Sequence, residues 1–589
     1  MYKTHTCGEL GVKDIGKEVS LAGWVDRLRD LGGVTFIDLR DRFGVIQIVS
    51  NPETSPIVHQ SLVPVRMEWV IQAVGIVRKR PKGMENPDLS TGDIEVELSR
   101  VEILNPAKTP PFLINQEEEV DEQTRLKYRY LDLRRPRMRD NLVLRHRVIS
   151  FIRNYLDQKS FLEIETPILF KTTPEGARDY IVPSRVHPGQ FYALPQSPQQ
   201  LKQMLMVAGV ERYFQIARCF RDEDQRGDRQ PEFTQLDIEM SFVEREDVMD
   251  LIEGLYTSLV KEVTPQKKVL STPWPKFSYQ QALDRFGKDN PDIRFEWELK
   301  DISEIAPESG FRVFSDTVNN GGTVRGINAK GLGDYSRKQI DELTEYTRQF
   351  GAGGLAYLAL TSGGEERSSF AKFLTEDAKS QILTIMEAQK GDLLVFVADT
   401  PEVVFESLGR LREEFRDRLN LVDQDTLGFC WVIDFPLVNW NKDEKRWDPS
   451  HHLFTSPMME DLESLDEDPL KVRGQQYDLV LNGYEIAGGS IRIHNADLQE
   501  KIFKLIGLDM DVARERFGHM LQAFSYGTPP HGGIASGMDR LCMLLADEPN
   551  IREVIAFPKN QSARDLMGNA PSPVEPEQME ELHIKLTLD

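Results

Sequence analysis

The sequence predicts an α+β protein of several domains, because three different patterns follow one another along its 589 residues. Residues 19–104 contain five strand-like runs with one helical stretch after the third, which is typical of a small barrel. Residues 211–242 predict a long antiparallel hairpin, and residues 289–426 predict a separate mixed α/β module. A chain of this length exceeds one hydrophobic core, so three or four domains are expected.

The composition is that of a soluble globular protein from a reducing compartment. Hydrophobic residues make up 40% and charged residues 28% of the chain, and no apolar run approaches the length of a membrane span. The first ten residues lack the apolar region of a signal peptide. The four cysteines show no CxxC spacing, so we expect neither a disulfide framework nor a structural zinc site. The sequence therefore predicts a cytoplasmic protein without a membrane partner.

The five strands and their helix follow the order of the oligonucleotide/oligosaccharide-binding (OB) barrel, whose open face takes single-stranded nucleic acid. Basic and acidic residues are almost equal in number over residues 1–105, whereas the whole chain has a net charge of -23. This balance favours a small, base-specific site over an electrostatic wrap. The candidate contact residues are Arg29, Phe36, Gln47 and Glu95. Phe36 is equally compatible with the barrel core.

Residues 106–140 predict a linker that ends in a basic patch. The linker is rich in proline and acidic residues, and the stretch from Arg125 to Arg139 then carries seven basic residues against one acid, Asp132. Two interpretations stay open: a solvated helical face, or a contact with a phosphate backbone that passes between domains.

The next segment, from residue 141, predicts a helix that runs into a strand closed by Pro167, and this pattern indicates a domain core or a subunit contact. A second helix follows the strand at residues 191–194, with Ser197 as its expected N-cap and Pro198 in its first turn. Its N-terminus carries Gln199 and Lys202, and it is either an ordinary capped helix or a site for a small carboxylate.

The hairpin over residues 211–242 has two flanks in which apolar and polar residues alternate, joined by a charged tip. Fixed cations and acceptors on rigid strands suit the binding of a polyanion such as a nucleoside triphosphate. The alternative is an amphipathic hairpin with a solvated turn. The polar residues that we expect on one exposed face and the loop are Arg221, Glu223, Gln230, Gln235, Asp237 and Glu239.

The mixed α/β module at residues 289–426 contains neither a Walker A pattern nor GxGxxG, and its glycines at 351–354 predict a turn. Its residues suggest no chemical role.

The C-terminal part returns to strands and carries several candidate site residues. His451 and His452 lack a third metal ligand at a suitable spacing, so their loop is either a surface turn or a mobile element that meets a substrate. Asp478 and Glu485 lie on two strands joined at a glycine and could hold one Mg²⁺ if the chain turns between them. Arg492 follows Glu485 at a later position of the same alternating pattern.

The last motif is a glycine-rich strand and turn that runs into an apolar helix, with Arg540 near the helix start. Small residues let the backbone approach a ligand closely, and an arginine there can meet a terminal phosphate.

These motifs resemble the class II aminoacyl-tRNA synthetases, and specifically the bacterial-type aspartyl-tRNA synthetase family, over nearly the full chain. The residues that carry the resemblance are FLEIETP (motif 1), CFRDED with QPEFTQLDIE (motif 2), GMDR within GGIASGMDRL (motif 3), TPEGARDY, QSPQQLKQ and GGSIRIH. The resemblance implies an OB-fold anticodon-binding domain at 1–105, a hinge at 106–140, a catalytic antiparallel sheet with flanking helices at 141–288 and 427–589, and an insertion domain at 289–426. One departure is Ala487-Gly488-Gly489, where family members carry three glycines.

The resemblance also implies residue roles in a homodimeric enzyme that activates L-aspartate with ATP and transfers it to the 3′ end of tRNA(Asp). Arg221 would hold the α-phosphate and the substrate carboxylate, and Arg540 would hold the γ-phosphate. The other implied ATP contacts are Glu223, Gln230, Phe233, Glu485, Gly537, Met538 and Asp539, and Mg²⁺ would bind Asp478 and Glu485. The implied aspartate pocket comprises Glu175, Gln199, Lys202, Arg221, Asp237, His451 and Arg492, and the anticodon would meet Arg29, Phe36, Gln47 and Glu95.

Some alternatives stay open on the sequence alone. An asparaginyl or lysyl enzyme of the same class is one, although a lysine pocket should carry acids in place of Lys202 and Arg492. A paralogue that makes asparagine or modifies another acceptor is a second, and a non-enzymatic single-strand-binding protein, which would explain the barrel alone, is a third. Within the family, Leu31 resembles members that charge only tRNA(Asp), and Gly83 resembles members that also charge tRNA(Asn).

Overall fold

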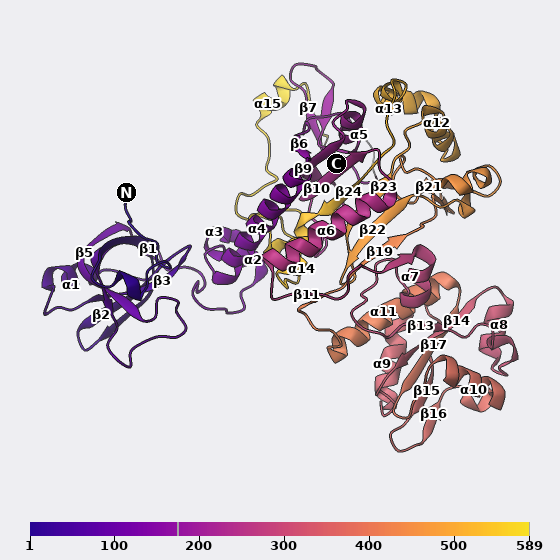
Figure 1. The fold of residues 1–589 in the computed structure, drawn as a ribbon, viewed down its shortest axis with the longest axis horizontal. Helices are drawn as coiled ribbons and strands as arrows, with labels where there is room; N and C mark the ends of the chain where they lie inside the picture. The colour runs from indigo at the N-terminus through magenta and orange to yellow at the C-terminus, as the bar shows by residue number, and fades with distance from the viewer. Residues whose placement is uncertain (173–175, 588–589) are drawn as a thin grey trace. The chain divides into compact units, whose positions relative to one another are not determined.

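The computed structural model describes residues 1–172 and 176–587. The chain divides into two compact units, one formed by Met1–Val143 with Ala556–Ser572 and the other by Leu144–Ile555 with Pro573–Asp589. Figure 1 shows their helices and strands. Within the described residues, no helix has both the length and the apolar character needed to cross a membrane.

The first unit contains a closed five-stranded barrel with the order β1-β2-β3-β5-β4, which confirms the OB-type prediction. Alternate residues of its strands, such as Leu21, Ile37 and Ile48, are fully buried inside it. The single helix follows the third strand, as expected. The bounds are β1 Glu18–Leu31, β2 Val34–Asp41, β3 Gly44–Ser50, α1 Pro56–Leu62, β4 Val70–Lys79 and β5 Ile94–Asn105.

Three of the seven basic residues in the basic patch of this unit are internal, which neither interpretation of the sequence expected. Helices α2 (Glu122–Lys127) and α3 (Arg129–Asp132) surround the fully buried carboxylate of Asp132. Arg125 Nε donates to it at 3.0 Å and Arg129 Nη1 at 2.6 Å, and Arg135 Nη1 lies 3.7 Å away. All three arginine residues are less than 10% exposed. A buried carboxylate is unfavourable unless cations surround it, and these arginines supply the cations.

The second unit is built on an eight-stranded sheet with the order β12-β19-β22-β23-β24-β10-β9-β6. It is antiparallel except at its two edges, where β12 runs parallel to β19 and β6 runs parallel to β9. The bounds are β6 Leu162–Glu163, β9 Arg212–Phe220, β10 Glu232–Ser241, β12 Lys276–Ser278, β19 Phe429–Ile433, β22 Gln476–Leu481, β23 Tyr484–Ile491 and β24 His531–Gly537.

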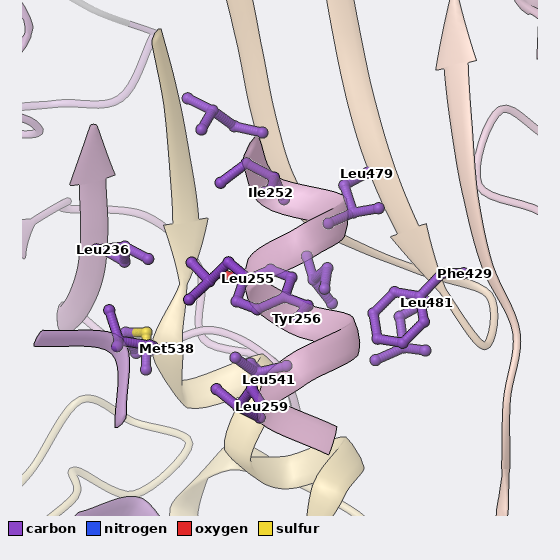
Figure 2. Close-up of a cluster of buried hydrophobic side chains, with 14 of the residues drawn as sticks. Leu236, Ile252, Leu255, Tyr256, Leu259, Phe429, Leu479, Leu481, Met538 and Leu541 are labelled. Carbon is purple, nitrogen blue, oxygen red and sulfur yellow. The ribbon is translucent and has the colours of Figure 1, made fainter. Parts of the chain in front are cut away.

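One face of this sheet is covered by α4 (Pro136–Gln158), α6 (Arg245–Val263) and α14 (Met538–Leu545). In Figure 2, Leu255 and Tyr256 of α6 lie among Leu236, Phe429, Leu479 and Leu481 from the strands β10, β19 and β22. Each fully buried side chain of this kind contributes about 1.5–3 kcal/mol. Since Leu236 and Ile238 of β10 point into this core, Gln235, Asp237 and Glu239 must point to the opposite face.

This unit contains a second, smaller core besides that of the sheet. Phe454 packs with α13 residues such as Phe517 in a second core, and Met204 and Val207 of α5 pack against it. The bounds of further elements of this unit are β7 Ile181–Pro183, β8 Phe191–Ala193, α5 Gln199–Val207, β11 Lys268–Val269, α7 Tyr279–Phe286, β18 Thr426–Leu427, β20 Val438–Asn441, β21 Arg446–Pro449, α12 Ala496–Leu505, α13 Met510–Phe524 and α15 Pro576–Glu581.

The inserted segment forms a separate five-stranded antiparallel sheet with the order β13-β14-β17-β15-β16, which confirms the predicted mixed α/β module. Helices α8 and α10 cover one face, and α9 and α11 cover the other. Burial on both faces explains why β17 is a continuous apolar run rather than an alternating one. The bounds are β13 Leu299–Asp301, α8 Arg312–Asn319, β14 Thr323–Ala329, α9 Arg337–Arg348, β15 Ala356–Leu360, β16 Glu366–Ser368, α10 Glu376–Ile385, β17 Leu393–Asp399 and α11 Pro401–Leu419.

Candidate active site

A cavity of about 710 Å³ lies over the polar face of the eight-stranded sheet. It brings together residues that are far apart in the sequence, including the three arginines Arg221, Arg492 and Arg540. The predicted site residues that line it are Gln199, Lys202, Arg221, Glu223, Gln230, Phe233, Asp237, His451, Glu485, Arg492, Gly537, Asp539 and Arg540.

The predicted hairpin forms one wall of this cavity. Strands β9 and β10 pair in antiparallel register, with Leu236 opposite Ile216, and this confirms the prediction for residues 211–242. The guanidinium carbon of Arg221 lies 5.0 Å from the centre of the Phe233 ring, so a cation and a flat apolar surface stand side by side. Glu223 at the tip accepts a hydrogen bond from Arg229 Nη1 at 3.0 Å. The hairpin thus presents groups suited to a planar ring and to an anion.

One end of the cavity contains three buried ion pairs formed by four side chains. Lys202 Nζ lies 2.5 Å from Asp237 Oδ1 and 3.3 Å from Glu239 Oε2. Arg492 donates to both oxygens of Glu239, from Nε at 3.0 Å and from Nη2 at 3.2 Å. All four side chains are at most 1% exposed. The polar face of β10 is therefore covered, whereas the sequence had suggested an exposed one.

The two acids in this cluster differ in their protonation behaviour. Burial raises the pKa of Asp237 against the opposing charge of Lys202. Burial acts in the same direction on Glu239, but Arg492 and Lys202 outweigh it and lower the pKa of that carboxyl. Asp237 Oδ2 has no hydrogen-bond partner among the described residues. The cluster can therefore receive a small ligand with an ammonium group for Asp237 and an acid group for the two cations.

The two histidines stand beside this cluster, with ring centres 4.4 Å apart. His452 Nδ1 accepts a hydrogen bond from the Phe454 N–H at 3.1 Å, and its Nε2 faces Arg492 Nη1 in a short contact. His451 Nδ1 lies 3.3 Å from Thr455 Oγ1. Burial and the nearby charges of Arg492 and Lys202 lower the pKa of His451 to about 3, so this ring is neutral at physiological pH.

The depressed pKa of His451 predicts a pH-dependent stability. Between the ordinary histidine pKa of 6.5 and the pKa of about 3 in the folded protein, the His451 ring binds a proton in the unfolded chain but not in the native one. The free energy of unfolding should therefore fall as the pH drops below 6.5, by at most about 1.4 kcal/mol per pH unit from this residue. Denaturant unfolding at pH 7 and at pH 5 measures this change. The free energy of unfolding should decrease less between the two pH values in His451→Gln than in the unchanged chain. Equal losses would contradict the assignment.

Asp478 and Glu485 converge on Gly488. A Cβ atom built on Gly488 would lie 3.2 Å from Asp478 Oδ1, 3.5 Å from Glu485 Oε1 and 3.6 Å from His451 Nε2. Burial and the charge of Glu485 raise the pKa of Asp478 well above its usual range. Burial also raises the pKa of Glu485, although Arg540 opposes the shift. Two carboxylates that repel each other around an open space form a cradle that suits a cation.

A β-bulge brings these two carboxylates to the same face. Asp478 pairs with Gly488 and Leu479 with Ala487, but Val480 then pairs with Glu485, so that Ile486 is an extra residue. In an unbroken ladder Glu485 would oppose Leu481 and point to the helix-covered face. No third His, Cys, Asp or Glu joins the pair in the part of the chain that the structure describes. This donor set fits Mg²⁺, which takes one or two carboxylates together with phosphate oxygens.

Arg540, in the first turn of α14, faces the same region. Its Nη2 lies 2.9 Å from Asp228 Oδ2 in the hairpin tip, and its Nη1 donates to the Glu485 carbonyl oxygen at 2.7 Å. Both side chains of the ion pair are partly exposed to the cavity. An incoming anion could therefore replace Asp228 as the partner of Arg540.

Besides Asp478, which is not among the lining residues, three predicted residues do not simply line the cavity. Met538 is fully buried in the hydrophobic core instead (Figure 2). Asp539 accepts hydrogen bonds from Arg145 at 2.5 Å and from the Thr234 N–H at 2.9 Å, so its carboxylate joins the cavity wall to α4 and β10. Glu175 lies outside the described residues.

The start of α5 differs from its prediction by one residue. Pro198 rather than Ser197 is the N-cap, although Ser197 Oγ still accepts a hydrogen bond from the Gln199 N–H at 3.3 Å. Both Ser197 and Gln199 line the cavity, so the helix N-terminus faces the site as expected.

Several residues that line the cavity or touch its charged cluster have only a weak signal in the sequence. Glu239 shows the alternation of β10, but only the structure reveals that it holds Arg492. Asp228 and Arg229 belong to a charged tip in which most residues carry a charge, so spacing alone does not select them. His452 had only its position beside His451 as a signal.

The barrel residues singled out in the sequence form a separate polar cluster on the first unit. Phe36 lies directly opposite Arg29 and is half-buried, outside the barrel core. Arg29 Nη2 lies 3.3 Å from Gln47 Oε1, and Gln47 Nε2 donates to Glu95 Oε2 at 2.7 Å. An aromatic ring therefore adjoins a chain of polar groups, as a base-specific site requires.

Leu31, the last residue of β1, and Gly83, in a turn, belong to the same barrel unit. Leu31 is 65% exposed at the end of β1. Gly83 has a φ of +85° in a turn and has no neighbouring atom within 4 Å of a built Cβ. Both residues are accessible to a partner of the barrel.

Comparisons with known proteins agree with this architecture. Residues 121–561 match the family described as tRNA synthetases class II (D, K and N), and residues 19–104 match the OB-fold nucleic acid binding domain. A relative from Rubrobacter xylanophilus named aspartate–tRNA(Asp/Asn) ligase is 57% identical over 100% of this chain and 97% of its own length. A relative of the same name from Caldanaerobacter subterraneus is 53% identical over 100% and 99%.

Solved structures share the fold at lower identity. Asparaginyl-tRNA synthetase from Pyrococcus horikoshii has a TM-score of 0.60 at 19% identity, covering 98% of this chain and 100% of that one. A putative aspartyl-tRNA synthetase from Leishmania major has a TM-score of 0.59, also at 19% identity, covering 94% of each chain. Since the family match spans most of the chain and the relatives are alike over its full length, this chain belongs to the class II tRNA synthetases of the D, K and N group.

Proposed function

We propose that the chain is an aspartate–tRNA ligase, which joins L-aspartate to the α-phosphate of ATP with release of pyrophosphate. It then transfers the aspartyl group to the 3′ end of tRNA(Asp), with AMP as the leaving group. The observation that carries the proposal is that Arg221, Arg492 and Arg540 line one cavity. Attack of a carboxylate on a phosphate brings two anions together, so cations must hold both in line. The printed names of the full-length relatives support the same activity.

In this mechanism the residues around Arg221 bind the nucleotide. Arg221 meets the α-phosphate and the attacking carboxylate, while Phe233 offers its ring to the adenine. Glu223 and Gln230 read the edge of the base, and Arg540 holds the γ-phosphate. No general base is needed, because the carboxylate that attacks is already ionised at neutral pH.

The charged cluster at the other end selects the amino acid. Lys202 and Arg492 face the β-carboxylate of aspartate, and Asp237 takes its ammonium through the free Oδ2. Asparagine would offer these two cations a neutral amide in place of a carboxylate, so it should be rejected by a factor on the order of 10³ or more. Gln199 and His451 complete the pocket, and the sequence resemblance adds Glu175.

Asp478 and Glu485 would hold Mg²⁺ at the cradle over Gly488. When bound there, the ion neutralises charge on the phosphate oxygens of ATP. The chain's own contribution is to keep the two carboxylates on the cavity face through the bulge at Ile486.

The barrel unit supplies the anticodon site in this proposal, with Arg29, Phe36, Gln47 and Glu95 as its contacts. We propose that both tRNA(Asp) and tRNA(Asn) are charged, which the names of the relatives support. Leu31 and Gly83, both accessible in the barrel, are the candidate residues for this choice.

We further propose a cytoplasmic homodimer with the domain bounds given by the sequence resemblance. All four cysteines are buried thiols without a disulfide, which suits a reducing compartment. Leu162, Ile168 and Leu169, in and just after the motif 1 stretch, are 47–55% exposed and form an apolar area suited to a second copy of the chain.

ATP–pyrophosphate exchange with each of the twenty amino acids tests the activity. We expect exchange with aspartate only, and exchange with asparagine or lysine would replace the proposal by one of the related enzymes. Aminoacylation of purified tRNA(Asp) and tRNA(Asn) tests the acceptor. Absence of exchange with every amino acid would contradict the proposed function.

Releasing Arg540 from its partner should favour ATP. ATP has to displace the Asp228 carboxylate from Arg540 before its phosphate can bind there. In Asp228→Asn this competing carboxylate is absent, so the KM for ATP should fall. Partly exposed ion pairs are worth roughly 0.2–1 kcal/mol, so we expect a decrease of at most about fivefold. Asp224→Asn removes the same charge from the same tip outside the cavity and should change the KM less. A rise in the KM for ATP in Asp228→Asn would contradict this account.

A further inference from the structure

The turn between β22 and β23 determines where Glu485 points. Asn482 and Gly483 are its two central residues, with φ values of +53° and +87°, and Leu481 pairs with Tyr484 across it. These are the signs of a two-residue type I′ turn, which fixes the register of the strands that it joins. A three-residue loop with Leu481 opposite Glu485 would remove the bulge at Ile486 and turn Glu485 to the other face.

The inserted segment holds this turn from outside. Asn290 Nδ2 donates to the Gly483 carbonyl oxygen at 3.0 Å. A Cβ atom built on Gly483 would lie 3.4 Å from Asp292 Cβ and 3.8 Å from Arg416 Nη1. The turn is therefore in close contact with the start of the insertion and with the last turn of α11, its longest helix.

The contact is built around one buried carboxylate. Asp292, 2% exposed, accepts hydrogen bonds from Arg294 Nε at 2.9 Å, from Arg294 Nη2 at 2.8 Å and from Arg416 Nη1 at 3.2 Å. Burial acts to raise its pKa, but these two arginines outweigh it and lower the pKa of the Asp292 carboxyl. The carboxylate is thus ionised and joins α11 to the chain segment that packs against Gly483.

Helix α11 is itself fixed in the insertion core through Leu408, Leu411 and Phe415, all fully buried. The contact therefore links a packed module to the hairpin that carries two carboxylates of like charge. Glu485 shares the cavity face with Asp478 only while the bulge at Ile486 is kept, so a fixed turn keeps the two side chains convergent.

We propose that Asp292 and Arg416 are positioning residues: through the Asn482–Gly483 turn they keep Glu485 beside Asp478, so that the insertion module sets the affinity of the site for the divalent cation and ATP. The inference rests on the proposed function in that metal-bound ATP is taken as the ligand. It gives a role to a module whose sequence suggested none.

The test compares Arg416→Ala with Arg416→Lys and with Arg418→Ala. Arg418 lies in the same last turn of α11 but pairs with Glu414 on the helix surface, so it is the matched control. In Arg416→Ala, Asp292 keeps both hydrogen bonds from the Arg294 side chain, so the fold should be retained. The conservative Arg416→Lys keeps the charge beside Asp292, so its Mg²⁺ requirement should lie close to that of the unchanged enzyme.

The first readout is independent of activity. Hydrogen exchange measured by mass spectrometry should show faster exchange over residues 481–486 in Arg416→Ala, with no change in β9 and β10. The second readout is the Mg²⁺ concentration for half-maximal aspartate-dependent pyrophosphate exchange. It should rise by about tenfold in Arg416→Ala, as for other groups that orient metal ligands, with the KM for aspartate within about twofold of the unchanged enzyme.

The outcomes separate this inference from the proposed function. If the unchanged enzyme shows no aspartate-dependent exchange, the proposed function fails, while faster hydrogen exchange in the turn would still support the link to Arg416. If the unchanged enzyme is active but Arg416→Ala has the same Mg²⁺ requirement, the inference is wrong. A parallel rise in the KM for aspartate, or the same change in Arg418→Ala, would also overturn it. Should Arg416→Ala not fold, Asn290→Ala, which removes the hydrogen bond to Gly483, is measured in its place with the same expected result.

Discussion

Aspartate-dependent pyrophosphate exchange should fall by a factor on the order of 10³ or more when Arg492 is replaced by leucine. The β-carboxylate of aspartate would lose one of its two proposed cations. Glu239 would lose the guanidinium that donates to both of its oxygens and would keep Lys202, at 3.3 Å, as its nearest cation. ATP binding should survive, because Arg221 and Arg540 are unchanged. Exchange kinetics and the binding of a fluorescent ATP analogue measure the two effects separately.

Stability has to be followed in the same experiment. Removal of one partner from a buried ion pair costs about 3–5 kcal/mol, so Arg492→Leu should also unfold at a lower temperature. Arg492→Lys keeps a cation without the planar fork and should fold better, yet with a raised KM for aspartate. Arg218→Leu is the control, because Arg218 is a partly exposed arginine on β9 that pairs with Glu232 outside the cavity. Normal exchange in a folded Arg492→Leu would remove Arg492 from the pocket.

Gly488→Ala should raise the Mg²⁺ requirement and the KM for ATP by roughly 10- to 100-fold. The added methyl group would stand 3.2 Å from Asp478 Oδ1 and 3.5 Å from Glu485 Oε1, in the space that a cation about 2.1 Å from each oxygen must occupy. Titration of exchange activity with Mg²⁺ and with Mn²⁺ measures the change. The KM for aspartate should move less, because the charged cluster around Glu239 is untouched.

The matched control is Gly518→Ala. Gly518 lies in the interior of α13, and a Cβ atom there meets nothing within 4 Å. The substitution should leave the Mg²⁺ dependence unchanged and stabilise the helix by about 0.5–1 kcal/mol. If Gly488→Ala keeps a normal Mg²⁺ dependence while folded, the cradle is not the cation site.

The alternation of side chains was enough to predict the barrel, the hairpin and the polar face of β10. Asp237 and Glu239 share that face because they are two residues apart, and Leu236 and Ile238 share the core face for the same reason. Short-range signals also located the strand-to-helix turn before Arg540. These features depend on residues that are close together in the chain, so a single sequence is enough to predict them.

Features that depend on distant partners could not be predicted in this way. The bulge at Ile486 is invisible in the spacing of Asp478 and Glu485, and only the ladder shows that it brings them to one face. The strand predicted for residues 161–167 shortens to Leu162–Glu163, since only these two residues pair with β9. The long helix begins at Pro136 rather than at residue 141, although a proline in the first turn was an available signal.

The internal cluster around Asp132 changes the expected electrostatics of RNA binding. Binding to a nucleic acid releases one condensed counterion for each phosphate that a protein cation neutralises, and this release sets the salt dependence of affinity. Arg125, Arg129 and Arg135 already share a carboxylate inside the protein and can displace no counterions. The slope of log Kd against log salt concentration should therefore be shallower than the seven basic residues of this segment would suggest, and tRNA affinity should tolerate rising ionic strength correspondingly well.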